Sequence, residues 1–276
     1  MLLLRSTRCG IIVSCMPFTL RESCEWMKRH EILGTPVDAL TYGDAVEKVR
    51  ASISTREPLW ILAVNPEKIM KTLKDRKLKK LLLCADLFIP DGVGILWAGK
   101  ILGKPFRQRV TGVDLLMTLV AEAAQKKWRI YLLGAEPGVA EAVAQKLGKS
   151  YPGLIVSGSR DGYFQVEEET EVVEEIKQAR PDLLFVGMGS PKQEEFIQTY
   201  RQELGVPVCM GVGGSFDVIS GKKKRAPRFL QRLGLEWTWR LVKEPTRISR
   251  MSVLPKFMLM VLREKFGLFK LEEEKL

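Results

Sequence analysis

The sequence predicts an α/β protein whose core is a Rossmann-like, mainly parallel sheet with helices on both faces. Short apolar runs alternate with longer segments of helical periodicity, and this alternation is the first observation behind the prediction. The second is that glycine-rich turns follow several of the apolar runs. The third is length, because 276 residues can bury a large core as one domain or as one domain with an appendage.

The first half of the chain is expected to contain three strands and four helices. Strands are expected at 32–36, 59–64 and 87–89, and helices at 45–53, 68–80, 95–101 and 115–126. In the first of these helices, the apolar residues that recur at helical spacing are Ala45, Val46, Val49 and Ile53. The helix at 68–80 is strongly basic.

Three strand, turn and helix units follow. Their strands are expected at 129–133, 183–186 and 206–210, and a further strand is expected at 154–157. Glycines in the turns let the backbone approach a ligand, and the free N–H groups of a following helix attract anions. None of the turns fits G-x-G-x-x-G with an acidic residue about 20 positions on, and no G-x-x-x-x-G-K-[ST] occurs. A dehydrogenase and a P-loop NTPase are therefore disfavoured.

Positive charge is concentrated towards the C-terminus. The net charge is +11, and the segment 222–270 alone carries fourteen Lys or Arg against three Glu. Localised charge of this kind indicates an anionic partner, which could be a phosphate-bearing substrate, an acidic membrane surface or nucleic acid. The same segment contains Trp, Phe and Met. Helices at 229–242 and 251–269 are therefore expected either to pack as ordinary amphipathic helices or to lie in a membrane interface.

The amino-acid composition argues against several kinds of functional site. The five cysteines lack zinc-site spacing and are too few for a disulfide scaffold, so a reduced cytoplasmic setting is expected. The only histidine, His30, lies outside the patterned region, which argues against a Ser-His-Asp triad and against a histidine metal site. No apolar stretch of about 18 residues occurs, so a membrane-spanning helix is not expected.

We divide the chain into three segments. Residues 1–30 show no clean periodicity, and we interpret them as an upstream extension. Residues 31–220 carry the α/β pattern. Residues 221–276 form a basic, partly amphipathic helical appendage that is expected to associate with an anionic membrane surface.

The stretch 85–94 contains the first candidate catalytic residue. An apolar strand ends there, and Asp91 lies in the Pro-Asp-Gly-Val-Gly turn that leads into a helix. Open α/β sheets bind ligands at the carboxyl ends of their strands, so a carboxylate at this point is well placed for chemistry. The alternative is that Asp91 caps the next helix or fixes the turn. Asn65, which follows the strand at 59–64, has two similar interpretations, as a helix cap or as a ligand contact.

Taken together, several blocks of residues resemble the WecG/TagA/CpsF family of bacterial glycosyltransferases. The resemblance covers about residues 32–250, and its blocks are N-P-E at 65–67, A-D at 85–86, P-D-G-V-G at 90–94, R-V-T-G-V-D at 109–114, G-M-G-S-P-K-Q-E at 187–194, G-V-G-G-S-F-D at 211–217 and R-A-P at 225–227. The family implies transfer of an N-acetylmannosamine-type sugar from a UDP-sugar donor to the C4 hydroxyl of N-acetylglucosamine on undecaprenyl diphosphate. It also implies inversion, without a metal or other cofactor.

The resemblance assigns roles to individual residues. It makes Asp91 the general base that takes the proton from the acceptor hydroxyl. No Asp-x-Asp metal–diphosphate signature occurs, so another cation must offset charge on the leaving UDP. Arg240, Arg247 and Arg250 match family positions in the appendage and suit that role. The other matched positions are Arg109 and Gln193 in the pocket and Asn65 near the acceptor.

One position departs from the family pattern. Ala63 stands where many relatives have Thr, which leaves the identity of the donor sugar open. By the resemblance, the appendage keeps the enzyme peripheral on the cytoplasmic face of the membrane, beside its lipid-linked acceptor, and wall teichoic acid synthesis is the pathway indicated. A homo-oligomer stays open. Two alternatives are a nucleic-acid-binding protein that uses the basic tail, which no recognition motif supports, and a Rossmann-like nucleotide-binding regulator or oxidoreductase.

Overall fold

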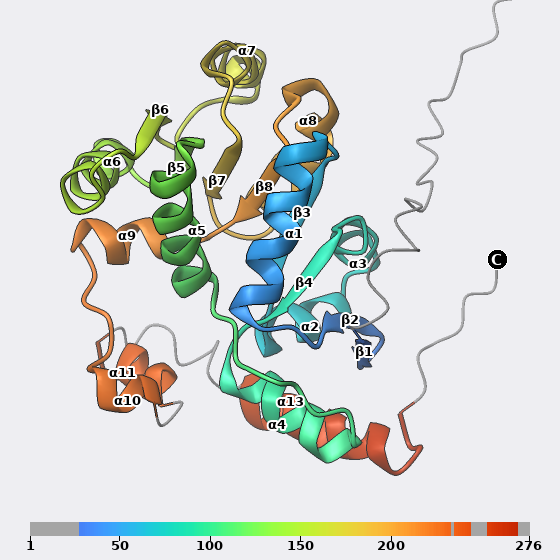
Figure 1. The fold of residues 1–276 in the computed structure, drawn as a ribbon. Coiled ribbons are helices and arrows are strands. Elements are labelled where there is room, and N and C mark those ends of the chain that lie inside the picture. The colour runs from blue at the N-terminus through green and yellow to red at the C-terminus, as the bar shows by residue number, and fades with distance from the viewer. Residues whose placement is uncertain (1–27, 233–234, 244–252, 270–276) are drawn as a thin grey trace, which may run out of the picture.

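The computed structural model describes residues 28–232, 235–243 and 253–269; at Arg228, Arg232 and 240–243 it describes the backbone alone. A six-stranded sheet forms the centre, in the order β4-β3-β8-β7-β5-β6, and every neighbouring pair is parallel (Figure 1). The strands are β3 Leu59–Val64, β4 Leu87–Pro90, β5 Arg129–Gly134, β6 Ile155–Arg160, β7 Leu183–Gly187 and β8 Val208–Gly211. This Rossmann-like sheet confirms the fold class predicted from the sequence.

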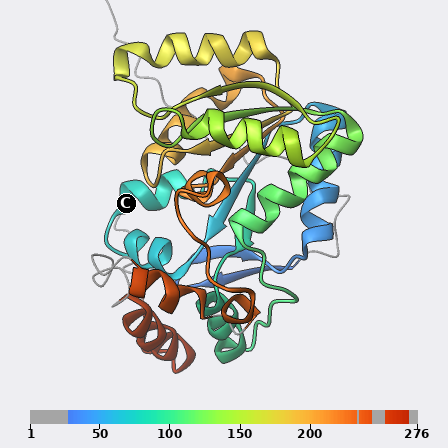
Figure 2. The ribbon, with the colours of Figure 1, turned by 90° about the vertical axis from the view of Figure 1, so that its left-hand side faces the viewer.

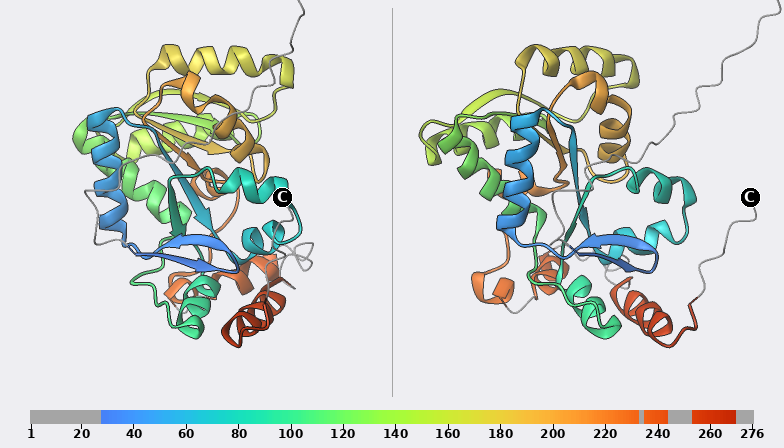
Figure 3. Two further views of the ribbon diagram at one scale, coloured as in Figure 1. Left: turned by 90° about the vertical axis from the view of Figure 1, so that its right-hand side faces the viewer. Right: turned by 45° about the vertical axis from the view of Figure 1, so that its right-hand side comes forward.

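Helices cover both faces of the sheet, because side chains alternate along each buried strand. In β3, Trp60 and Leu62 belong to one apolar cluster, whereas Ile61 and Ala63 belong to the other. The helices that pack on the first cluster are α2 Pro66–Thr72, α3 Arg76–Leu82, α4 Val93–Leu102, α7 Glu169–Ala179 and α8 Lys192–Leu204. Those on the second are α1 Tyr42–Thr55, α5 Gly112–Lys126, α6 Val139–Ser150 and α9 Ser215–Ser220 (Figures 2 and 3).

Several elements differ from those expected. The strand expected at 32–36 is wrong, because β1 Arg29–Ile32 and β2 Thr35–Asp38 form an antiparallel hairpin that turns at Leu33 and Gly34. Both turn residues have positive φ, 50° and 70°. The basic helix expected at 68–80 is two helices, α2 and α3. Asp75 begins the second one by accepting a hydrogen bond from the backbone N–H of Leu78 at 3.0 Å. Helix α7 has no counterpart among the expected elements.

The C-terminal segment contributes to the core. Helix α13 Val253–Lys265 packs against α4 and α2 (Figures 1 and 3). Its Phe257 and Val261 are fully buried. The helix expected at 229–242 is two short helices, α10 Arg228–Arg232 and α11 Glu236–Lys243. The boundary between core and appendage at residue 221 stays a prediction, and most of the extension assigned to 1–30 lies outside the described residues.

Replacing Gly94 by Ala is expected to destabilise the contact between α4, α2 and α13. A Cβ at Gly94 would lie 2.7 Å from Pro66 Cγ and 2.9 Å from Leu254 Cδ1, so the Pro66 ring, the Leu254 side chain or the helices that carry them would have to shift. Overpacking of this kind costs about 1–3 kcal/mol, which a lower Tm would report. Gly148→Ala in α6 is the matched control, because a Cβ there meets no atom within 4 Å and should stabilise the helix by roughly 0.5–1 kcal/mol. Equal Tm values for the two variants would contradict the close approach at Gly94.

Candidate active site

A pocket of about 530 Å³ opens at the carboxyl ends of β3, β4, β7 and β8. Doubly wound sheets bind ligands at this edge, because the loops that leave the strands there diverge to opposite faces. The lining residues include Ala63, Asn65, Lys68, Asp91, Arg109, Thr111, Gln193, Gly213, Lys224, Arg225, Trp237 and Trp239. Four of the site residues predicted from the sequence, Asn65, Asp91, Arg109 and Gln193, are therefore brought together.

Asp91 follows β4 directly and is half-buried. Its backbone N–H donates to Val64 O at 2.9 Å, which fixes the end of β4 against the end of β3. The N-cap position of α4 belongs to Gly92, whose φ of 91° favours glycine. The N-cap position is therefore occupied by the neighbour of Asp91. The alternatives that Asp91 fixes the turn or acts chemically both stay predictions, and its position on the pocket wall agrees with a chemical role.

Asn65 caps α2 and also lines the pocket. Its Oδ1 accepts a hydrogen bond from the backbone N–H of Lys68 at 2.9 Å, and Pro66 occupies the first turn, as is favourable at a helix start. The capping interpretation is confirmed. A cap uses only the side-chain oxygen, so the amide NH₂ group is not required for it. The ligand role of Asn65 stays a prediction that is compatible with the cap.

Gln193 lies in the first turn of α8 and is 3% exposed. Its Oε1 accepts a hydrogen bond from the backbone N–H of Gly213 at 3.0 Å, and its Nε2 donates to Glu194 Oε1 at 2.9 Å. Lys68 Nζ pairs with the same Glu194 oxygen at 2.8 Å. Gln193 thus lines the pocket while both ends of its carboxamide contact the protein. Sequence reasoning does not identify Lys68 or Glu194 as site residues, although Glu194 is the last residue of the motif at 187–194.

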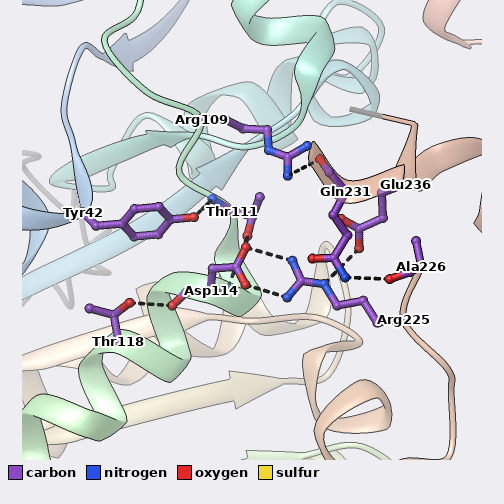
Figure 4. Close-up of polar contacts among 9 residues, drawn as sticks. All are labelled: Tyr42, Arg109, Thr111, Asp114, Thr118, Arg225, Ala226, Gln231 and Glu236. Atoms are coloured by element: carbon purple, nitrogen blue, oxygen red, sulfur yellow. Dashed lines mark hydrogen bonds and ion pairs between the residues drawn. The ribbon is translucent and has the colours of Figure 1, made fainter. Parts of the chain in front are cut away.

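A second polar cluster joins α5 to the C-terminal segment (Figure 4). Arg225 donates to both oxygens of Asp114, at 2.5 and 2.8 Å, and its Nε lies 3.4 Å from Glu236 Oε1 at the start of α11. Arg109 Nη2 donates to Gln231 O at 3.2 Å. Asp114 also accepts a hydrogen bond from the Thr111 hydroxyl at 2.6 Å. This cluster holds α11 over the pocket.

Electrostatics agree with the geometry of this cluster. Burial alone would raise the pKa of Asp114, but the hydrogen bonds from Arg225 and Thr111 outweigh burial and hold the pKa below its ordinary value. The hydrogen bond to Asp114 raises the pKa of Arg225, which keeps the guanidinium charged. Arg225 and Asp114 both lie in motif blocks of the sequence. Because they are 111 positions apart, no local sequence pattern could predict that they pair.

Three of the four cations in the loop 222–225 are paired with acids elsewhere in the fold. Lys222 pairs with Glu136, Lys223 with Asp217 at 3.1 Å, and Arg225 with Asp114. Each of these acids precedes the segment whose charge was counted in the sequence. Part of the local excess of charge in this loop is therefore neutralised by acids from other parts of the fold, and the anionic partner inferred from the charge stays a prediction.

Two tryptophans of α11, Trp237 and Trp239, form an apolar wall of the pocket. Trp239 Nε1 donates to Lys224 O at 3.4 Å, which ties α11 to the loop 222–225. The sequence shows both residues only as part of an amphipathic pattern. Of the three arginines assigned to the appendage, Arg240 lies on α11 but its side chain is not described, and Arg247 and Arg250 lie outside the described residues. Their roles stay predictions.

Neither a metal-binding cluster nor a membrane-spanning helix is present in the part of the chain that the structure describes. There, no group of three or more His, Cys, Asp or Glu side chains could hold a metal ion. Likewise, none of the helices in the described ranges is long and apolar enough to cross a bilayer.

Asp114→Asn is expected to destabilise the protein in a pH-dependent way. The pKa of Asp114 is lowered in the fold, so the ionised carboxylate stabilises the folded chain above the unfolded pKa of about 3.9. This contribution is lost as the pH falls through the lower, folded pKa. The difference in free energy of unfolding between wild type and Asp114→Asn should therefore be constant near neutral pH and shrink below about pH 4. Urea unfolding across this range checks it, and a difference that grows on acidification would contradict it.

Fold and pocket together define a doubly wound α/β protein with its ligand site at the carboxyl edge of the sheet. A family model described as the glycosyl transferase WecG/TagA/CpsF family matches residues 30–270. The chain belongs to this family, which confirms the resemblance of its motifs and favours a transferase over a nucleic-acid-binding protein or a nucleotide-binding regulator.

Curated relatives agree with the family assignment. The chain is 39% identical over 219 residues to a protein of Bacillus subtilis strain 168, covering 79% of this chain and 82% of that protein. It is 38% identical over 206 residues to one of Bacillus spizizenii, covering 75% and 79%, and 35% identical over 237 residues to one of Staphylococcus aureus strain MW2, covering 85% and 92%. All three are named N-acetylglucosaminyldiphosphoundecaprenol N-acetyl-beta-D-mannosaminyltransferase.

Proposed function

We propose that this glycosyltransferase moves N-acetylmannosamine from a UDP-linked donor to the C4 hydroxyl of N-acetylglucosamine on diphosphoundecaprenol, with inversion and without a metal. The names of the relatives support the acceptor and the transferred sugar. One structural observation carries the proposal: the Asp91 carboxylate lies at the end of β4 in the same pocket as Asn65 and Arg109. A carboxylate, an amide and a guanidinium suit a base, a sugar contact and a phosphate contact.

In the proposed reaction Asp91 is the general base. The acceptor C4 oxygen attacks the anomeric carbon, and Asp91 takes the proton of the hydroxyl as the new bond forms. UDP leaves from the opposite face of the sugar, so a single displacement inverts the anomeric centre. One base and one displacement are sufficient, and the pocket offers one carboxylate at a strand end for that purpose.

Cations of the pocket would offset the charge that grows on the leaving UDP. Arg109 lines the pocket, and its guanidinium fork can match two phosphate oxygens. Arg225, in contrast, is held by Asp114 and Glu236. We assign Arg240, Arg247 and Arg250 to the same task from the family pattern. Ala63 lines the pocket where many relatives have Thr, so the donor sugar is the part of the proposal that most needs measurement.

We place the enzyme peripherally on the cytoplasmic face of the membrane, in teichoic acid or surface-polysaccharide synthesis. Helix α13 supports a membrane contact, because Leu259 and Leu262 are exposed three residues apart on it and Phe266, directly after its end, is exposed as well, with the exposed Arg263 beside them. Cations close to such a surface attract anionic lipid by about 1 kcal/mol each. Homo-oligomer formation stays a prediction.

The proposal is tested by UDP release from a panel of UDP-N-acetylhexosamines, with and without lipid-linked N-acetylglucosamine diphosphate, in the presence of EDTA. Release from UDP-N-acetylmannosamine that requires the acceptor is the expected result. Acceptor-dependent release from a different UDP-sugar would contradict the proposed donor sugar but would support the proposed type of reaction. Activity that EDTA abolishes and Mg²⁺ restores would contradict metal independence, and no release from any donor by folded, full-length protein would overturn the proposal.

A further inference from the structure

A chain of polar contacts runs along the wall of the pocket and joins two of its loops. It begins at Asn65, which caps the Lys68 backbone N–H, and continues from Lys68 Nζ to Glu194 Oε1 at 2.8 Å. Gln193 Nε2 donates to the same Glu194 oxygen, and Gln193 Oε1 accepts from the backbone N–H of Gly213. The chain therefore connects the loop after β3 with the loop after β8, through α2 and α8.

The Lys68–Glu194 pair at its centre is deeply buried. The Lys68 side chain is 10% exposed and that of Glu194 is fully buried. Buried ion pairs often stabilise a fold no better than an apolar pair of the same size, because both charges must lose their water. Within the described residues, the second Glu194 oxygen, Oε2, is buried without a hydrogen-bond partner, which adds to that cost. Fold stability alone is thus a poor explanation for this pair.

Orientation of the Gln193 carboxamide is a better explanation. An ionised carboxylate only accepts hydrogen bonds, so it turns the NH₂ end of Gln193 towards Glu194 and the oxygen towards Gly213. The fit is close, because a Cβ at Gly211 would lie 2.5 Å from Gln193 Nε2. If the carboxamide rotated by half a turn, its NH₂ group would face the N–H of Gly213, and the loop 211–214 would lose its anchor.

We propose that Lys68 and Glu194 are positioning residues for sugar transfer: they hold Gln193, and through it the glycine loop 211–214, at a fixed distance from Asn65. Lys68 pairs with Glu194 Oε1 at 2.8 Å and holds it in place, and Glu194 fixes which end of the Gln193 carboxamide meets Gly213. This inference rests on the proposed function, because the two loops that it joins leave the neighbouring strands β3 and β8 and both line the pocket in which the transfer is proposed to occur.

The test compares single and double substitutions of the pair. Lys68→Met or Glu194→Met alone leaves one buried charge without its partner, so each should lower Tm. The double variant has an apolar pair of similar volume and should recover the wild-type Tm. It should nevertheless have kcat at least about tenfold below wild type, because a small misplacement of site residues is costly to the rate. It should also show faster amide hydrogen exchange at Gly213, which has lost its fixed acceptor.

Lys177→Met/Glu174→Met is the matched control, since this exposed pair on α7 has the same residue types at 2.9 Å and is absent from the pocket lining. It should leave kcat and exchange unchanged. A Lys68/Glu194 double variant with wild-type kcat, or with wild-type exchange at Gly213, would overturn the inference. If wild-type protein releases no UDP from any donor, the proposed function fails, whereas the exchange measurement still decides whether the pair positions the loop.

Discussion

Asp91→Asn is expected to lower kcat by roughly 10² to 10⁴, the range that general-base catalysis contributes, while the fold stays intact. The carboxamide has nearly the shape of the carboxylate but cannot take the proton of the acceptor hydroxyl. Because the backbone hydrogen bond from Asp91 to Val64 O does not involve the side chain, the end of β4 should stay in place. UDP release at saturating donor and acceptor measures the loss, and Tm measures the fold.

Asp75→Asn is the control for this substitution. Asp75 lies at the exposed start of α3, and its replacement by Asn is the same chemical change as Asp91→Asn. Because Asn caps helices as well as Asp does, activity and Tm should both stay at the wild-type level. Turnover of Asp91→Asn close to wild type would remove Asp91 from the mechanism. A large drop in Tm would instead assign Asp91 to the structure of the turn.

Local patterns were sufficient to predict the sheet and the position of the catalytic candidate. The strand expected at 59–64 is β3 without change, and Asp91 follows β4 as expected, because short apolar runs and glycine turns are local properties of the chain. The hairpin at Leu33 and Gly34 was missed because its turn lies inside an apolar run. The break between α2 and α3 depends on one residue, the N-cap Asp75. Because the residues on both sides of Asp75 are rich in lysine, the sequence pattern indicates one continuous basic helix.

Long-range pairing is the part of the site that local patterns do not contain. Three of the four cations of 222–225 pair with Asp114, Glu136 and Asp217, so counting charge within one segment cannot reveal how much of it is neutralised. The same limit applies to Gln193. Its place in the pocket could be inferred from a motif, but its anchoring of Gly213 depends on the meeting of two loops in the folded chain.

Arg225→Ala is expected to release α11 from the core and to lower kcat/KM at least about tenfold, since Trp237 and Trp239 would no longer hold their side of the pocket. Two charged hydrogen bonds to Asp114 would be lost. The Asp114 side chain is 38% exposed, so water can replace part of this interaction. We therefore expect a loss of about 1–2 kcal/mol in the free energy of unfolding.

Arg225→Lys separates charge from geometry. Lysine keeps the positive charge but cannot donate to both Asp114 oxygens as a rigid fork, so kcat/KM should fall between wild type and Arg225→Ala. Arg107→Ala removes the same charge from an exposed position outside the pocket lining and should leave kcat/KM unchanged. If Arg225→Ala also kept the wild-type kcat/KM, the contact between Arg225 and Asp114 would be a surface ion pair without influence on α11, and the position of the two tryptophans would have to depend on other contacts of that helix.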